Sequence, residues 1–149
     1  MSSSNAFENS LLLLVFNNTD IANVGDAAGL QNSVAAGSLF VALHTADPGE
    51  GGDQTTSETV YTNYARVAVA RSGAGWTVSG TAPTQAANAA AVTFPTCGAT
   101  GATLTYFSVG LITSGASVIV ASGILTAQLI VSNGITPSFA IGALTVTLD

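Results

Sequence analysis

The chain has 149 residues, a length that suits one domain with a substantial hydrophobic core. Charged residues make up only 7% of it, far below the ~25% of typical soluble domains, and the formal net charge is −6. Two arginines without any lysine cannot neutralise a phosphate backbone or an anionic lipid surface, so neither nucleic acid nor a membrane is an expected partner.

One long segment of the sequence carries no charge at all. From Ser72 to Leu148 there is no aspartate, glutamate, lysine, arginine or histidine. Acid–base catalysis and hard-metal binding depend on such side chains, because protons must be exchanged or charge donated. Free monomers usually mix both signs of charge on their surfaces. The chain is therefore expected to be a non-enzymatic building block that neighbouring chains cover.

Targeting signals are not expected in this sequence. The most apolar run, Val118–Val131, is shorter than the ~20 residues of a membrane span and is interrupted by polar residues. The first residues lack the basic region of a secretory signal, and the single Cys97 provides no disulfide framework. These features favour a protein made and assembled in the cytoplasm.

The first expected element is a helix that Asn5 caps, with Glu8 three residues later completing a capping box. Its apolar residues, Phe7 and the run Leu11–Phe16, cover every face. A helix that is apolar all round is buried all round, so we expect this one to lie between its own sheet and a partner. An extended arm should follow, with a turn of helix near Gly29–Asn32.

From Leu39 onward the apolar period changes from helical to alternating, which predicts β-strands. The expected strands lie near residues 39–44, 67–70, 76–78, 91–94, 103–112, 118–125, 129–131 and 144–148. Short strands separated by Gly, Ser, Asn and Pro are typical of sandwiches and barrels, and without crossover helices they pair antiparallel. The predicted fold is all-β: an antiparallel β-sandwich or jelly-roll of about eight strands with a short N-terminal helix. Residues 1–149 should form a single domain, with a helix and arm over 1–36 and the sandwich over 37–149.

Few side chains are suited to catalysis. His44 is the only histidine and falls in an alternating strand, without a nucleophile motif elsewhere, so a hydrogen-bonded structural role is expected. Cys97 follows Pro95 and Thr96 at the edge of a turn, where no neighbour would activate its thiol. No catalytic residue and no cofactor is predicted.

The loop Asp47–Asp53 concentrates three carboxylates among glycines. Such oxygens could gather around Ca²⁺, but the spacing is not that of an EF-hand. We expect an exposed, metal-free turn that Pro48 and Gly49 shape.

The two arginines lie in a region rich in polar and aromatic residues. Arg66 and Arg71 are five positions apart and would face opposite sides of a strand, so a shared anion site is not expected. Each is expected to make hydrogen bonds or ion pairs with carboxylates, some of them across a subunit boundary. Trp76 should anchor a core or an interface. The candidate interface residues are Leu12, Leu13, Phe16, Arg66, Arg71 and Trp76.

Several stretches together resemble a known family. They are Gly37–Glu50, Thr56–Tyr61, Tyr64–Arg71, Gly75–Val78, Ala91–Pro95, Ser132–Phe139 and Gly142–Asp149. In this combination the chain resembles small structural proteins of tailed bacteriophages, whose members are labelled tail fibre proteins or phage proteins, and also jelly-roll capsid cement proteins. The resemblance covers about residues 37–149 and implies a virion structural protein without catalytic residues.

The resemblance implies a capsid decoration protein on the outside of a phage head, bridging major capsid subunits. Its expected partners are copies of itself, as a dimer or trimer, and the major capsid protein. It would be made in the host cytoplasm and reside on the capsid exterior of the virion. The alternative is a tail or tail-fibre component that contacts the host surface. An envelope hydrolase is disfavoured, since the uncharged half lacks the carboxylate pair such enzymes use.

Overall fold

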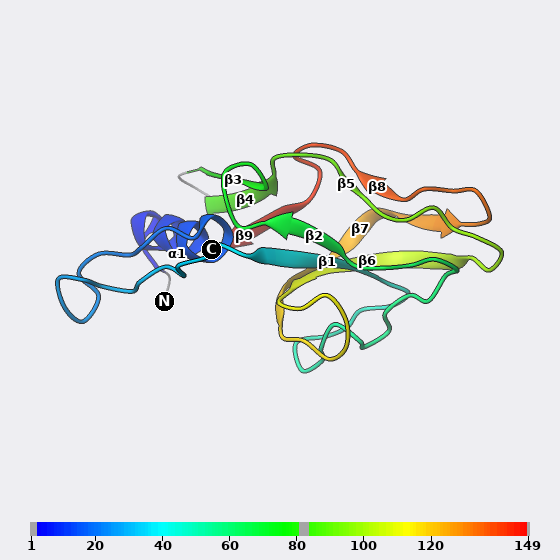
Figure 1. Ribbon diagram of the computed structural model, residues 1–149, viewed down its shortest axis with the longest axis horizontal. Helices are drawn as coiled ribbons and strands as arrows, with labels where there is room; N and C mark the ends of the chain where they lie inside the picture. Colours follow the sequence, from blue (N-terminus) through cyan, green and yellow to red (C-terminus); the bar gives the residue numbers. More distant parts are fainter. Residues whose placement is uncertain (1–2, 81–83, 149) are drawn as a thin grey trace. The chain divides into compact units, whose positions relative to one another are not determined.

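The computed structural model describes residues 3–80 and 84–148, so Asp149 lies outside the described residues. The chain forms two compact units. Unit 1 comprises Met1–Ser38, Ala70–Ala91 and Phe139–Asp149, and unit 2 comprises Leu39–Val69 and Val92–Ser138. The described residues contain one helix and nine strands, paired antiparallel where the register is defined (Figure 1). The predicted all-β class with a short N-terminal helix is therefore confirmed, whereas the single-domain boundaries stay a prediction.

Unit 1 contains helix α1 (Asn5–Asn17) and the antiparallel sheet β3-β4-β9. Its strands are β3 (Trp76–Ser79), β4 (Thr84–Asn88) and β9 (Thr145–Leu148). The helix packs on β3 and β4, where Leu12 and Phe16 are buried. The Phe16 ring meets the Trp76 ring edge-on, with centroids 4.9 Å apart. This apolar contact fixes the helix on its sheet.

The start and the buried face of α1 differ from the sequence-based expectation. The N-cap is Ser4 and not Asn5: Ser4 has an extended backbone, and its hydroxyl accepts a hydrogen bond from the Phe7 amide. Glu8 does not close a capping box; it turns inward and accepts a hydrogen bond from the Thr84 hydroxyl at 3.4 Å. Within this chain only one stripe of the helix is buried, and Phe7 remains 42% exposed.

The arm that follows α1 contains no turn of helix near Gly29–Asn32, so that prediction is wrong. Instead, Ile21 and Leu30 exchange backbone hydrogen bonds as an isolated antiparallel bridge. Gly29 adopts φ +69°, and a Cβ there would overlap the Ile21 carbonyl. The close approach of the two sides of the bridge therefore requires glycine and bends the chain out of a helical path.

The four-stranded sheet has the order β2-β1-β6-β7 and belongs to unit 2 apart from its terminal residues Ser38 and Ala70. Its strands are β1 (Ser38–His44), β2 (Val67–Ala70), β6 (Ala102–Gly110) and β7 (Ile119–Val131). Leu39, Val41 and Leu43 of β1 are buried as the alternation predicts. Ala42 and His44 are buried as well. Both faces of this strand are therefore covered.

β7 is one continuous strand where the sequence predicts two, at residues 118–125 and 129–131. Its register against β6 shifts between the pairs Leu104–Leu129 and Tyr106–Ile124, so only Thr105 opposes the four residues 125–128. This bulge interrupts the apolar alternation, which explains why the sequence suggests two strands.

The short strands β5 (Val92–Thr93) and β8 (Ser138–Phe139) form a further two-stranded sheet. Neither β4 nor β8 was predicted. No helix in the described ranges combines the length and apolarity needed to cross a membrane.

Candidate functional site

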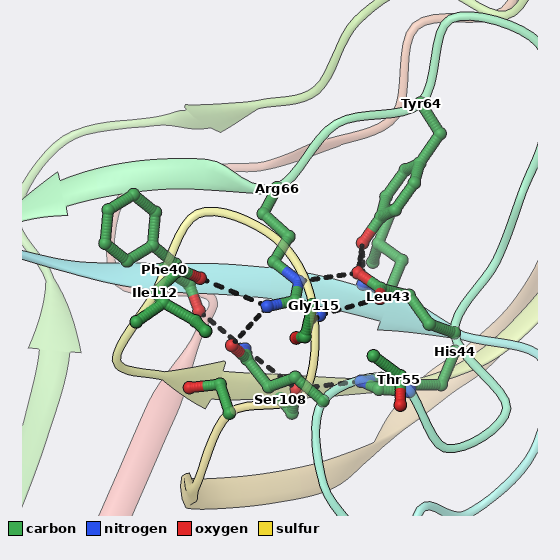
Figure 2. A network of polar contacts seen from close by, with 12 residues as sticks. Phe40, Leu43, His44, Thr55, Tyr64, Arg66, Ser108, Ile112 and Gly115 are labelled. Carbon is green, nitrogen blue, oxygen red and sulfur yellow. Dashed lines mark hydrogen bonds and ion pairs between the residues drawn. The ribbon is translucent and has the colours of Figure 1, made fainter.

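A polar group centred on Arg66 lies in unit 2 (Figure 2). We call it the Arg66 cluster; it comprises Arg66, Glu58, Gln54, Tyr64, His44 and Ser108. Arg66, immediately before β2, donates from Nε to Glu58 Oε1 at 2.7 Å and from Nη2 to Glu58 Oε2 at 2.8 Å. This two-pronged geometry is the strongest form of the arginine–carboxylate pair. The expectation that Arg66 pairs with a carboxylate is confirmed.

The same guanidinium also fastens a loop. Nη1 donates to the Ile112 carbonyl at 3.1 Å, and Nη2 donates to the Gly115 carbonyl at 2.8 Å. Nη1 donates in addition to Gln54 Oε1 at 3.1 Å. Arg66 therefore ties the turn that follows β6 to the segment that carries Gln54 and Glu58.

Gln54 extends the cluster to the sheet. Its Nε2 donates to the Phe40 carbonyl at 2.9 Å and to Ser108 Oγ at 3.3 Å. Ser108 Oγ lies 2.7 Å from His44 Nε2, and His44 Nδ1 lies 2.9 Å from the Thr56 carbonyl. Because a carbonyl can only accept, Nδ1 carries the proton and Nε2 accepts from the Ser108 hydroxyl. Both ring nitrogens are engaged, so the expectation that His44 is hydrogen bonded within the fold is confirmed.

The charges in the cluster are balanced. Burial lowers the pKa of His44, and this outweighs the opposing effects of the Thr56 hydrogen bond and the Glu58 charge. The hydrogen bonds that Arg66 donates to the Glu58 carboxylate raise the pKa of Arg66. Burial raises the pKa of Tyr64, whose hydroxyl donates to Glu58 Oε1 at 2.9 Å. At neutral pH the cluster thus holds one ion pair and neutral His44 and Tyr64 side chains.

Gly110 makes room for this arrangement. A Cβ at Gly110 would overlap the side chain of Gln54. The position is intolerant of a side chain because the amide of Gln54 occupies that space to reach Phe40 and Ser108.

Arg71 performs a different task in unit 1. Nε donates to the Val15 carbonyl and Nη2 to the Leu14 carbonyl, each at 2.7 Å, and Nη1 donates to the Ala36 carbonyl at 3.1 Å. Leu14 and Val15 lie in the last turn of α1, where carbonyls lack partners within the helix. Arg71 thus caps the helix C-terminus and places a cation at the negative end of the helix dipole. Its contacts are main-chain carbonyls rather than the carboxylate that the sequence suggested.

The remaining candidate interface residues lie mostly inside unit 1. Leu12, Phe16 and Trp76 are buried by their own chain, and Leu13 is partly exposed. Within the chain they form the contact between α1 and its sheet. Their participation in an interface with another molecule stays a prediction, as it does for the two arginines.

The other predicted site residues show local hydrogen bonding. Cys97 is buried, and its thiol donates to the Gly98 and Thr100 carbonyls. Asp47 and Glu50 are exposed, whereas Asp53 is partly buried and accepts hydrogen bonds from the Thr55 hydroxyl and amide, which lower its pKa. Within residues 3–80 and 84–148, no group of three or more acidic, histidine or cysteine side chains is placed to hold a metal ion.

Several buried polar residues carry no recognisable signal in the sequence. Ser108 lies diagonally across from His44 in the pairing of β1 with β6. Their contact follows from this strand register, which the sequence does not reveal. Asn88 ends β4 and donates from Nδ2 to the Ala90 and Ala140 carbonyls at 2.8 Å each, while its Oδ1 accepts from the Leu144 amide at 2.8 Å. Nothing in the local pattern around Gln54 or Asn88 distinguishes them from surface residues.

Comparison with known proteins identifies the chain at the level of a family. The family model described as Podophage GP4 fiber I protein gp80 matches residues 2–147. The chain belongs to this family. It is a family of phage structural proteins, which confirms the broader part of the resemblance but does not specify capsid decoration. Among curated proteins, none matches.

Proposed function

We propose that the chain is a structural, non-enzymatic component of a fibre on a tailed-phage virion. The observation that carries this proposal is the family match, which extends from residue 2 to residue 147 and names a fibre protein. The fibre assignment is the alternative that the sequence offers beside capsid decoration. It has better support than capsid decoration, because the family description refers to a fibre and makes no reference to the capsid.

The arrangement of polar side chains supports a structural role. His44 uses both ring nitrogens in internal hydrogen bonds, and Arg66 and Glu58 satisfy each other. Burial raises the pKa of Tyr61 to about 12, and its hydroxyl donates to the Pro95 carbonyl. Groups so engaged hold segments together and are poorly placed to attack or protonate a substrate.

The surface supports incorporation into an assembly. Large apolar side chains are exposed along the uncharged half of the chain, and Val118, Ile124, Ile130 and Ile141 are each at least 66% exposed. We therefore propose that copies associate as dimers or trimers within the virion. Sedimentation velocity of the purified protein tests this, and a strictly monomeric species up to high concentration would contradict it.

The location in the particle can be tested with purified virions. Immunogold labelling should place the protein on fibres, and a stain-quantified gel should give a few copies per virion. Label spread over the head, with hundreds of copies, would instead support the capsid decoration protein that bridges major capsid subunits. Co-sedimentation with heads that lack the protein provides a second measurement, and no binding is expected.

A further inference from the structure

An open groove runs beside the Arg66 cluster in unit 2 and has a volume of about 570 Å³. One wall is the acidic loop, with Gly49, Glu50, Gly52 and Asp53, and the other is the continuous segment Ala116–Ser122. We call it the β7 groove. Figure 1 shows the acidic loop in teal and the loop that leads into β7 in yellow, both below β1 and β6; the rest of the second wall is the start of β7 itself.

The second wall contains the beginning of an exposed sheet edge. β7 is the last strand of the order β2-β1-β6-β7, so one of its long sides has no neighbouring strand within the described sheet. Such an edge presents backbone donors and acceptors that an extended peptide can pair with. Proteins commonly protect edges with lysine, other charges or proline, yet Ile119–Val131 contains none of these. The register of β7 against β6 shifts at Val120 and again at residues 125–128. Ala121–Ile124 pairs regularly between these shifts, and Ala121 and Ser122 of this stretch line the groove.

The groove is already shaped by internal hydrogen bonds. The backbone N–H of Gln54 donates to the Ser117 carbonyl at 3.0 Å, and the backbone N–H of Leu111 donates to Ser117 Oγ at 2.9 Å. Arg66 holds the same turn through the Gly115 carbonyl. Because both walls are fastened to one cluster, a ligand would not have to order them on binding.

The charge of the groove selects among possible occupants. Glu50 is exposed, and the hydrogen bonds from Thr55 keep Asp53 ionised, so the groove is negative. A second copy of this chain would bring a net charge of −6, no lysine, and two arginines that are engaged internally. It therefore lacks a complementary cation, whereas a basic segment of another protein would supply one.

We propose that the β7 groove binds an extended, basic segment of a different protein, which adds a strand to the open edge of β7 while its lysines or arginines face Glu50 and Asp53. The inference does not depend on the fibre assignment, since it concerns the chemistry of the occupant and not the location of the protein in the virion.

The proposal can be tested by fluorescence anisotropy with a labelled peptide of alternating lysine and valine. Two peptides of equal length serve as controls. One alternates glutamate and valine and lacks the positive charge; the other alternates lysine and proline and keeps the charge but cannot pair as a strand. Only the lysine–valine peptide should bind saturably at physiological salt.

Matched protein variants locate the binding. Val118→Lys introduces a cation into the groove at an exposed position, and Ile141→Lys makes the same change at an exposed position that does not line it. Val118→Lys should weaken peptide binding about fivefold or more, whereas Ile141→Lys should change it by less than about twofold. Glu50→Gln should likewise weaken binding relative to Asp47→Asn, which removes the same charge outside the groove.

Four outcomes would overturn the proposal. They are equal binding of the lysine–proline peptide, equal effects of the matched variants, no binding of the lysine–valine peptide, and a wild-type self-association that Val118→Lys alone abolishes. The last result would assign the groove to a second copy of this chain. Circular dichroism of each variant confirms that it is folded, and the exposure of the substituted side chains favours this.

Discussion

Arg66 donates two hydrogen bonds of nearly equal length to Glu58, from Nε to Oε1 at 2.7 Å and from Nη2 to Oε2 at 2.8 Å. Both side chains are largely shielded from water, with exposures of 2% and 15%. A pair in this setting stabilises the fold only while both partners are present, because either charge alone would be buried without compensation. The pair therefore couples the segment around Glu58 to the loop that Arg66 also holds.

Replacing Arg66 should be among the more damaging single substitutions. Arg66→Ala is expected to lower the free energy of unfolding by about 3–5 kcal/mol. The substitution leaves the Glu58 carboxylate without its cation and removes the hydrogen bonds to the Ile112 and Gly115 carbonyls. Arg66→Lys should recover only part of this loss, because an ammonium cannot reproduce the planar fork. Urea unfolding measures both values. A lysine variant as stable as the wild type would show that charge alone matters.

The stability of the fold should depend on pH through His44. Its pKa is lowered below the ordinary 6.5, mainly by burial, so below pH 6.5 the unfolded chain binds a proton before the folded chain does. Stability should fall as the pH drops from about 6.5 to the pKa of the folded state, and this contribution should be flat at higher pH. Unfolding midpoints in urea across this range measure the slope.

NMR provides a direct check, since the chain contains a single histidine. The imidazole resonance should titrate below pH 6.5 in the folded protein, and a midpoint above that value would contradict the prediction. Asp53 cannot produce the same slope. Hydrogen bonds from Thr55 lower its pKa from 3.8, so its stabilising effect is lost only at more acidic pH.

Two adjacent leucines on α1 should respond differently to truncation. Leu12 is 3% exposed and packs inside unit 1, so Leu12→Ala should cost about 2–5 kcal/mol of unfolding free energy. Leu13 is only partly buried, and Leu13→Ala should cost clearly less. Chemical denaturation of the two variants under identical conditions provides the comparison. Equal losses would indicate that Leu13 is covered in the purified protein, as a self-association contact would require.

Arg71 should stabilise the end of α1 from a distance in the sequence. Arg71→Gln removes a cation that donates to the Leu14 and Val15 carbonyls, and a loss of about 1.5–3 kcal/mol is expected. Hydrogen exchange should become faster in the last turn of the helix. Unchanged exchange of those amides would contradict a capping role for the guanidinium.

The sequence predicts the strands with clear apolar alternation and fails where polar residues point inward. β1, β2 and β9 follow their alternating patterns. β4 does not, because its inward positions are Thr84, Ala86 and Asn88, which lack the apolar signature of a buried strand face. Asn88 is tolerated there since its amide is fully hydrogen bonded to backbone groups.

The candidate site was predictable to a similar extent. Arg66 and Glu58 lie close in sequence, so their pairing could be anticipated from charge. The carbonyl partners of Arg71 and the role of Gln54 could not, because main-chain acceptors leave no trace in composition. The Arg71 contacts require the fold, because it brings Val15 and Arg71, which are far apart in the sequence, within hydrogen-bond distance.

The interleaving of the two units has a consequence for synthesis on the ribosome. Unit 2 ends at Ser138, whereas the sheet of unit 1 is completed only by β9, which pairs with β4 from Thr145 to Leu148. The nascent chain therefore finishes every segment of unit 2 while β4 is paired with β3 alone and still lacks its second neighbour, although α1 precedes all of these strands. The helix, β3 and β4 are therefore made well before β9, the strand that completes their sheet.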